Sequence, residues 1–549
     1  MSYHKKNRVI FGNIIFFFAL FLIFSKDAPV TSLAWGQLTE EQPAGKAGRW
    51  MAGDFHQHTL YTDGSFSMSQ VISNGFLFGL DWQANAEHGG TSERNENKVY
   101  WDDPGLNTTF LGDPVFKDDH RLMWRWQNLR DYAYPQVLAL RTANPDKLIA
   151  LGLEWNIPGH EHCLVGIVAD DGKTISEFEY LFDRLDRDTS RNLPKQNGEK
   201  DHGIGIFGHS ERAHIDALSA AVWLKANCQY TSWLIPSHPE RLRSYDIAHL
   251  RDLNNTAPDV AFGFEGIPGH QKSKIRGEYS IQSNGGATYG GAGCYAAKVG
   301  GLWDALLGEG RVFSTFANSD FHTASNSFWP GEYAKNYTFV QDRNGDGQYS
   351  LEELVHGLRS GNTFCVTGDL IDALDFRVQS GDMSACMGQT LHLAKGDKLR
   401  ITIRFKSPKI NHHGDPVRVD HLDLISGEVT GRVDPSDKKA YHKDTNQSTR
   451  VLARFTKQDW REDDGRWQII EYTLENVEKD GYFRLRGTNL APGTTGETDM
   501  DGNPLPDAAF LLGSNDGETA WRDLWFYSNA IFVNVHQSPF QRHPPLPLS

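Results

Sequence analysis

The chain has 549 residues, of which 39% are hydrophobic and 23% are charged. This composition supports packed cores and excludes wholesale disorder, and the length is sufficient for at least two domains. Lysine and arginine number 55 and aspartate and glutamate 70, so the net charge of −15 gives no support to a broad basic surface for nucleic acid.

The first 34 residues have the pattern of an export signal. Lys5, Lys6 and Arg8 precede an apolar run over 9–24, and small residues lead up to Ala34. The run is 16 residues long, shorter than the about 20 that a membrane-spanning helix needs. We therefore predict a cleaved signal peptide over 1–34, with an uncleaved membrane anchor as the alternative. The protein is expected in the periplasm or outside the cell if bacterial, with membrane contact only through this segment.

Residues 35–49 are predicted to be a linker, and residues 50–375 alternate short apolar runs with helix-like segments. This alternation predicts βα units that form a parallel sheet or a barrel. The predicted strands are 50–55, 81–86, 148–154, 162–168, 232–237, 260–265 and 312–319. Helices are predicted over 123–139 and 303–307, and the charged stretch 170–205 is predicted to be an inserted loop.

Residues 376–549 have a different texture, in which apolar and polar residues alternate between turns rich in glycine, aspartate, asparagine and proline. This pattern predicts an antiparallel β-sandwich of about 170 residues. The five cysteines are scattered and odd in number, so they predict neither a disulfide framework nor a zinc site of paired CxxC motifs.

Imidazoles and carboxylates recur where the predicted strands of the first domain end. His56 and His58 are two residues apart on an extended segment, so their side chains point to the same side. The groups at these strand ends include His56, His58, Asp63, Glu87, His88, Glu154, His160, His162, His238, Asp320 and His322. Strand ends of a βα barrel meet on one face, so residues distant in sequence can share one site there. Histidine and carboxylate suit zinc, manganese or iron, and so many groups predict two or three divalent ions.

In these motifs the chain resembles the PHP (polymerase and histidinol phosphatase) metallohydrolases. The matching segments are Asp54–Thr59 with Asp63-Gly64, Glu87-His88, Gly152–Glu154, His238-Pro239 and Ser319–His322, in the family's order. The resemblance implies a distorted seven-stranded βα barrel followed here by the β-sandwich, bound metals and hydrolysis of phosphate esters.

The resemblance also implies roles for individual residues. Its motifs assign metal binding to His56, His58, Asp63, His88, Glu154, His238, Asp320 and His322. In the family a metal-binding histidine follows the central glutamate, and here either His160 or His162 could take that place. His162 is preferred as the ligand, and His160 is then expected to support the ligands or to face the substrate. Glu87 stands where the family often has aspartate, and either Glu87 or His160 is expected to move protons.

The segment Asp342–Glu353 fits the calcium-loop pattern D-x-[DN]-x-[DN]-G-x5-E. Its predicted oxygen ligands are Asp342, Asn344, Asp346, Ser350 and Glu353. A helix over 350–359 is expected to follow the loop and a strand over 335–340 to precede it, which makes half of an EF-hand. The alternative is a solvated Asp/Gly turn.

Three functions are consistent with these patterns. The leading hypothesis is an exported phosphoesterase whose ions activate water against a small-molecule ester. The second hypothesis keeps the same ions but has them cleave a carbamate or carboxylic ester. It rests on a resemblance to the exported PHP subgroup of carbaryl-hydrolase-like proteins, which is carried by the export signal, the Gly361–Phe364 stretch and the sandwich. The third is a non-catalytic surface protein that binds its ligand through the sandwich and holds structural metals.

Overall fold

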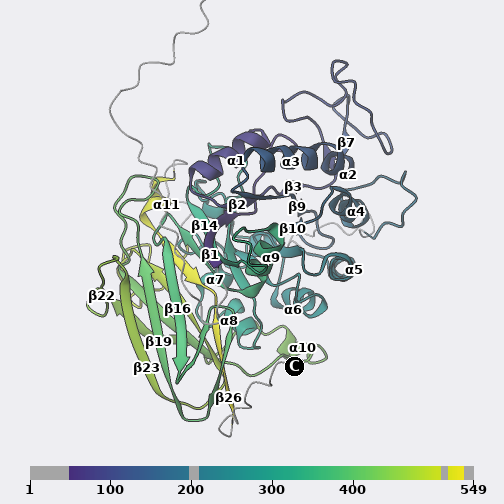
Figure 1. Cartoon of the computed structure of the whole chain (residues 1–549). Helices are drawn as coiled ribbons and strands as arrows, with labels where there is room; N and C mark the ends of the chain where they lie inside the picture. The colour runs from purple at the N-terminus through teal and green to yellow at the C-terminus, as the bar shows by residue number, and fades with distance from the viewer. Residues whose placement is uncertain (1–47, 197–208, 508–516, 537–549) are drawn as a thin grey trace, which may run out of the picture. The chain divides into compact units, whose positions relative to one another are not determined.

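A computed structural model describes residues 48–196, 209–507 and 517–536 (Figure 1). The predicted signal peptide and most of the linker lie outside these residues. Helices and strands are mixed along the chain, so the α/β class is as predicted. None of the helices in the described ranges is long and apolar enough to cross a membrane.

The first part of the chain contains the elements that carry the candidate site. Its principal strands are β1 (Gly48–Asp54), β2 (Trp82–Ala84), β3 (Glu87–His88), β8 (Leu148–Ala150), β9 (Gly152–Trp155), β10 (Cys163–Ile167), β11 (Ser232–Pro236), β12 (Gly263–Ile267), β13 (Ser314–Ala317), β14 (Ala334–Gln341) and β15 (Thr363–Thr367). Its helices include α1 (Met68–Leu77), α3 (Tyr134–Ala143), α4 (Lys173–Phe182), α5 (Glu211–Cys228), α6 (Ile247–Thr256), α7 (Cys294–Ala297), α8 (Leu302–Leu307) and α9 (Leu351–Ser360). Each predicted strand of this part overlaps an observed one.

The described strands do not close into one barrel, which corrects the simplest form of the prediction. Strands β1, β2 and β8 are parallel neighbours, as are β3 and β9, and β12 and β13. Strand β10, however, is antiparallel to both β9 and β11, and β14 is antiparallel to β1. Only the short turn 156–162 joins β9 to β10, and a connection of that length permits a hairpin but not a parallel crossover.

One predicted helix of this part is confirmed with an irregularity, and one predicted loop is wrong. After a short strand β7 (Met123–Trp124), the helix expected over 123–139 runs without a break through α2 (Arg125–Asn128), a π-helical turn η1 (Leu129–Ala133) and α3. Pro135 follows the π-helical turn and has no amide hydrogen to donate, which accounts for the irregularity. The loop expected over 170–205 contains α4, whose buried Ile175, Phe178 and Leu181 recur at helical spacing.

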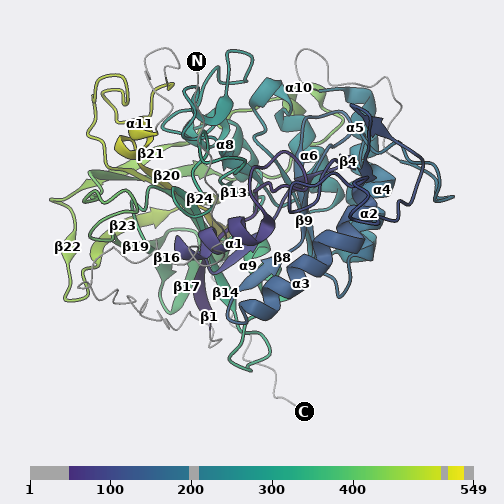
Figure 2. The ribbon, with the colours of Figure 1, turned by 90° about the horizontal axis from the view of Figure 1, so that it is seen from above.

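The strands after residue 375 belong to two sheets. They are β16 (Ala373–Ser380), β17 (Met383–Cys386), β18 (Thr390–Ala394), β19 (Asp397–Lys406), β20 (His421–Glu428), β21 (Arg450–Thr456), β22 (Arg461–Glu462), β23 (Gln468–Val477), β24 (Gly481–Thr488), β25 (Trp525–Ser528) and β26 (Ile531–His536), with short helices α10 (Lys438–Tyr441) and α11 (Glu518–Arg522). Figures 1 and 2 show β16, β19 and β23 side by side in a five-stranded antiparallel sheet with β17 and β22. On β19 Leu399, Ile401, Ile403 and Phe405 are buried in alternation, as predicted.

The other sheet crosses residue 375. Strand β15 pairs with β14 on one side and with β25 on the other, and β25 continues to β24 and β26. Strand β18 joins β26 in parallel, so the pairing of this part is not wholly antiparallel. All five cysteines are buried free thiols.

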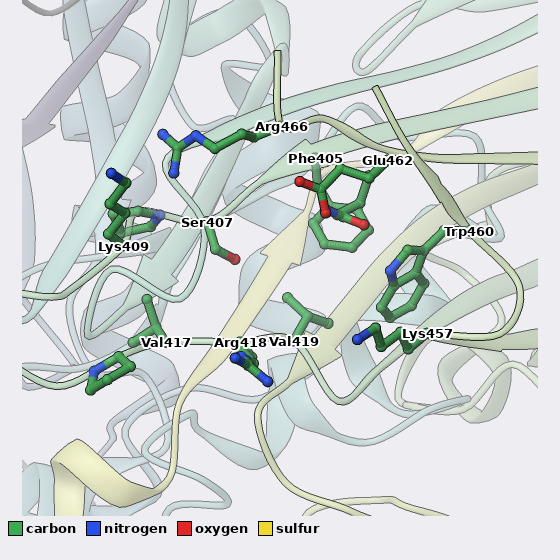
Figure 3. A pocket seen from close by; sticks show the side chains of 13 residues that line it. Phe405, Ser407, Lys409, Val417, Arg418, Val419, Lys457, Trp460, Glu462 and Arg466 are labelled. Atoms are coloured by element: carbon green, nitrogen blue, oxygen red, sulfur yellow. The ribbon is translucent and has the colours of Figure 1, made fainter. Parts of the chain in front are cut away.

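A cleft of about 440 Å³ opens on the C-terminal strands (Figure 3). Its charged lining consists of Lys409, Arg418, Lys457, Arg466 and one carboxylate, Glu462. No histidine lines this cleft, so its lining does not have the mixture of imidazole and carboxylate that a transition-metal site needs.

Candidate metal centre

The centre is built where strands of three different sheets end, the 11-stranded sheet with β1, the four-stranded sheet with β9 and β11, and the pair of β12 and β13. The Trp82 ring packs directly against the backbone of Gly53. Any side chain there would clash, because a Cβ on Gly53 would lie 1.9 Å from the ring. Phe55 then packs between Trp82 and Phe316, with ring centroids 5.7 and 5.3 Å away. The next residue, His56, faces the opposite side and enters the site, as the alternation of an extended segment requires.

A backbone bridge joins the two histidine motifs of this site. The His58 amide donates to the Phe321 carbonyl at 2.8 Å, and Gln57 pairs with Phe321 in a parallel bridge. Asp54 accepts from the His56 and Ser319 amides at 2.9 and 2.8 Å. The first and last motifs of the sequence are therefore held side by side.

Glu154, at the end of β9, lies at the middle of the centre. Its Oε1 is 3.2 Å from His56 Nε2, and its Oε2 is 3.3 Å from His58 Nε2. Asp320 Oδ1 is 3.1 Å from His56 Nε2 and 3.3 Å from His58 Nε2. These four buried residues form one group of converging ligand atoms.

A second group of histidines contacts the carboxylate of Glu154. His88 Nδ1 is 3.2 Å from Oε2, and the nearest nitrogens of His162 and His238 lie 3.2 and 3.1 Å from Oε1. One carboxylate thus lies within reach of five imidazoles, which is the arrangement of a bridging ligand between two ions.

A third group lies toward the solvent. Asp63 Oδ2 is 3.5 Å from His88 Nε2 and 3.3 Å from His322 Nε2. His58 belongs to this group too, with its Nδ1 3.6 Å from Asp63 Oδ1. All nine residues predicted to bind metal therefore lie in one continuous cluster.

The donor set fits divalent transition metals by chemistry and by spacing. Two ligand atoms that each lie about 2.0–2.1 Å from a tetrahedral zinc ion are about 3.3 Å apart. The nitrogen-to-oxygen distances above are 3.1–3.6 Å. Among the described residues, buried atoms of this cluster without a hydrogen-bond partner are His56 Nε2, His58 Nδ1 and Nε2, His88 Nδ1, His162 Nδ1, His238 Nδ1 and Asp320 Oδ1. Ions would satisfy such atoms.

Imidazole and carboxylate shift one another's protonation in the ion-free chain. Burial alone would lower the pKa of the His58 imidazole. The neighbouring carboxylates of Asp320 and Glu154 outweigh burial and raise this pKa to about 10. Burial raises the pKa of Glu154, yet His162, His56 and His88 bring it well below its usual range. The carboxylates are therefore ionised ligands throughout the neutral range.

Residues that the sequence analysis missed surround the ligands. Glu265 Oε1 is 2.9 Å from His56 Nδ1 and its Oε2 accepts from the His238 amide at 2.8 Å, so it orients two ligands. His270 Nε2 lies 3.0 Å from Asp320 Oδ2. Glu265 ends a predicted strand, the same signal that identified Glu154, whereas nothing in the pattern singled out His270.

A cation also reaches the centre. Arg241 Nη2 lies 2.8 Å from His238 Nε2, and its Nε donates to Glu161 Oε1 at 2.9 Å. The neighbouring guanidinium of Arg241 and the imidazole of His238 outweigh burial and lower the pKa of Glu161 to about 2. A permanent positive charge thus lies at the edge of a site rich in carboxylates.

The two residues predicted to move protons lie elsewhere. Glu87 is fully buried and accepts hydrogen bonds from the hydroxyls of Thr59 and Thr62, both at 2.5 Å, so it fixes the turn after His58. His160 lies 2.6 Å from the Ser244 carbonyl and 2.7 Å from His214 Nδ1. The described contacts therefore give no geometric support to a catalytic role for either, because the side chains are already engaged away from the ligand atoms.

Backbone strain is concentrated at this site. His238, His270 and Asp320 have φ of 30°, 54° and 45°, the left-handed region that non-glycine residues rarely adopt. Such strain persists only where the surrounding structure fixes it, and it is frequent at functional sites.

The loop predicted to bind calcium lies apart from these ligands, between β14 and α9, as its flanking elements predicted. Asp342 accepts from the amides of Gly345 and Gly347, and Glu353 accepts from the amides of Arg343 and Ser350. The bonds fold the segment into a compact loop, and calcium binding there stays a prediction.

Comparisons with known proteins give only weak structural likeness. A scan against protein-family models finds no match, and a search of curated proteins finds none. A two-domain protein from Bacteroides vulgatus, described as containing a predicted PHP-like metal-dependent phosphoesterase, is similar at 12% identity and a TM-score of 0.34. The likeness covers 83% of this chain and 93% of that one. At this level neither fold nor activity follows from it.

Proposed function

We propose that this chain is a metal-dependent phosphoesterase of the PHP type that uses two or three divalent ions. The observation that carries the proposal is the ligand cluster in which Glu154 and Asp320 are shared among buried imidazoles at ligand spacing. Ions bound there lower the pKa of a bound water and stabilise negative charge on a reacting ester. His56, His58, Asp63, His88, Glu154, His162, His238, Asp320 and His322 would hold them.

Arg241 favours phosphate over carbamate as the substrate group. A guanidinium makes charge-assisted bonds to phosphoryl oxygens, and a neutral carbamate offers no such charge. The Arg241 guanidinium reaches the centre, because its Nη2 lies 2.8 Å from His238 Nε2, and Glu161 fixes its orientation. The carbamate or carboxylic ester activity is the alternative, because the same ions would activate water against carbon.

A substrate panel tests the proposal. Purified protein should hydrolyse an aryl phosphate monoester or diester faster than an aryl carbamate, and exhaustive chelation should abolish that turnover until zinc or manganese is restored. Hydrolysis that survives chelation would refute a metal-dependent mechanism. If no ester is turned over by metal-loaded protein, the non-catalytic binding protein becomes the better explanation.

Arg241 variants separate phosphate from carbamate. Arg241→Lys keeps the charge but loses the paired donors, so we expect at least a tenfold higher KM for the phosphate ester, equivalent to about 1.4 kcal/mol. Turnover of the carbamate should change little. The same loss for both substrates would instead mean that Arg241 only supports His238, and Glu161→Gln serves as the control for that support.

We further propose that the chain is exported, that residues 50–375 form a distorted PHP barrel that stays open, and that residues 376–549 form a β-sandwich, one sheet of which continues into β15 and β14. Intact-mass measurement of protein from the secreted fraction tests the first point. A mature amino terminus after Ala34 supports a cleaved signal, and a retained N-terminus in the membrane fraction supports an anchor.

A further inference from the structure

A second group of imidazoles lies where helices α5 and α6 begin. His209 and Glu211 flank Ser210, the N-cap of α5, and His249 is in the first turn of α6. Glu211 Oε1 lies 3.4 Å from His209 Nε2 and 3.1 Å from His249 Nε2. None of these three residues belongs to the metal centre described above.

The other ring nitrogen of each histidine has an acceptor beside it. His209 Nδ1 is 3.2 Å from the Arg243 carbonyl oxygen, which accepts its hydrogen. His249 Nδ1 is 3.0 Å from Asp246 Oδ1, and in the ion-free chain it accepts a hydrogen bond from the Asp246 amide at 3.1 Å. Metal-binding histidines commonly donate their other N–H to a carbonyl or a carboxylate. An ion at this site requires the His249 hydrogen to lie on Nδ1, where Asp246 Oδ1 can accept it in place of the bond from the Asp246 amide. Both Nε2 atoms would then present lone pairs toward Glu211.

The distances have the values of a coordination shell. The 3.1 and 3.4 Å separations lie on either side of the about 3.3 Å expected between tetrahedral zinc ligands. The three ligand atoms lie within 4.8 Å of one another, and His249 is buried while Glu211 is exposed. We propose that His209, Glu211 and His249 bind one zinc-type divalent ion at a separate site, with the fourth position open to water.

This site is connected to the metal centre by one turn of the chain. The turn carries His238 and Arg241 at one end and supplies the Arg243 carbonyl and Asp246 at the other. Leu242 and Arg243 have φ of 52° and 58°, so the turn is held in a strained form. An ion between α5 and α6 would hold this turn, and through it the position of Arg241.

Metal stoichiometry of the full chain tests the proposal without any measurement of turnover. Chelator-treated protein is titrated with zinc, and with cobalt to follow the absorption bands of a four-coordinate His₂Glu site. Wild type should bind one more ion per chain than Glu211→Gln, and His209→Gln should lose the same ion. Glu352→Gln is the matched control, because Glu352 is an exposed glutamate in the first turn of α9.

A second variant separates this ion from those of the centre. Asp320→Asn should lose ions of the centre and keep the cobalt bands of the His209–Glu211–His249 site. Glu211 is 70% and His209 30% exposed in the side chain, so both replacements should fold, which circular dichroism checks. Equal stoichiometry in wild type and folded Glu211→Gln would overturn the proposal, as would loss of every ion in Asp320→Asn. These outcomes do not depend on whether the chain hydrolyses phosphate esters.

Discussion

At the residue scale, two buried carboxylates hold the metal centre together. Glu154 and Asp320 are each surrounded by imidazoles, and neither charge has contact with bulk water. A buried carboxylate is costly unless it is paired or binds a metal, so these positions tolerate few replacements. Their geometry was foreseeable in part, because Glu154 ends a predicted strand and Asp320 follows one.

Asp320→Asn should remove the ions of the metal centre and the activity together. Asparagine keeps the shape and accepts the left-handed backbone at this position, but it is a poorer ligand without the charge. Loss of a supporting residue alone typically costs 10–100-fold, so we expect turnover to fall more than about a hundredfold for this ligand. Elemental analysis and ester hydrolysis measure both effects. Asp415→Asn, at an exposed carboxylate, is the control, and an active Asp320→Asn would contradict the assignment.

The ion-free chain should lose stability as pH rises. His58 and His238 have pKa values of about 10 and about 9 in the folded chain, against about 6.5 for an ordinary histidine. Their imidazolium–carboxylate contacts therefore stabilise the fold fully below about pH 6.5 and lose this contribution as pH rises through 9–10.

Thermal unfolding of chelated protein between pH 6 and 10 measures that loss as a falling Tm. Zinc-loaded protein should not show the same fall, because ligand nitrogens that bind an ion carry no proton in either condition. A Tm of chelated protein that stays level across this range would argue against protonated imidazoles in the ion-free centre.

At the element scale, the strand ends were predictable and the paths between them were not. The order of strand-end motifs placed His56, Glu154 and Asp320 correctly in one cluster, because each motif belongs to its own strand. Arg241 and His270 were missed, since both lie on irregular segments whose course depends on tertiary contacts. The hairpin of β9 and β10 was also missed, because a run of apolar residues predicts a strand but not its direction relative to its neighbours.

Strand β10 depends on a glycine at its contact with β11. Gly166 pairs with Trp233, and a Cβ on Gly166 would lie 1.9 Å from the Trp233 ring. Gly166→Ala should therefore force the tryptophan out of its position and lower the free energy of unfolding by about 1–3 kcal/mol. Urea unfolding followed by tryptophan fluorescence measures it. Gly105→Ala is the control, since its methyl group meets only the exposed carboxylate of Asp103, and an equal effect in both variants would contradict the packing argument.

At the scale of the whole molecule, the segments before and after residue 375 share buried charges as well as a sheet. Arg276 Nη1 donates to Asp523 Oδ2 at 2.6 Å, and both side chains are 2% exposed. Arg484 binds Asp304 through two bonds of 2.7 Å, again fully buried. Ion pairs of this kind fix the relative position of the segments that they join, because breaking one leaves an uncompensated buried charge.

Arg276→Ala should therefore do more than remove one contact. The pair with Asp523 is buried, so its loss is expected to lower the free energy of unfolding by about 3–5 kcal/mol. Arg130→Ala, which breaks a partly exposed pair with the adjacent Asp131, should cost at most about 1 kcal/mol. Arg276 also lies six residues after His270, which contacts Asp320, so metal affinity at the centre should fall with stability. Urea unfolding and zinc titration of both variants measure these changes. If Arg276→Ala unfolds at the same urea concentration as Arg130→Ala, the C-terminal segment does not hold the metal centre in place.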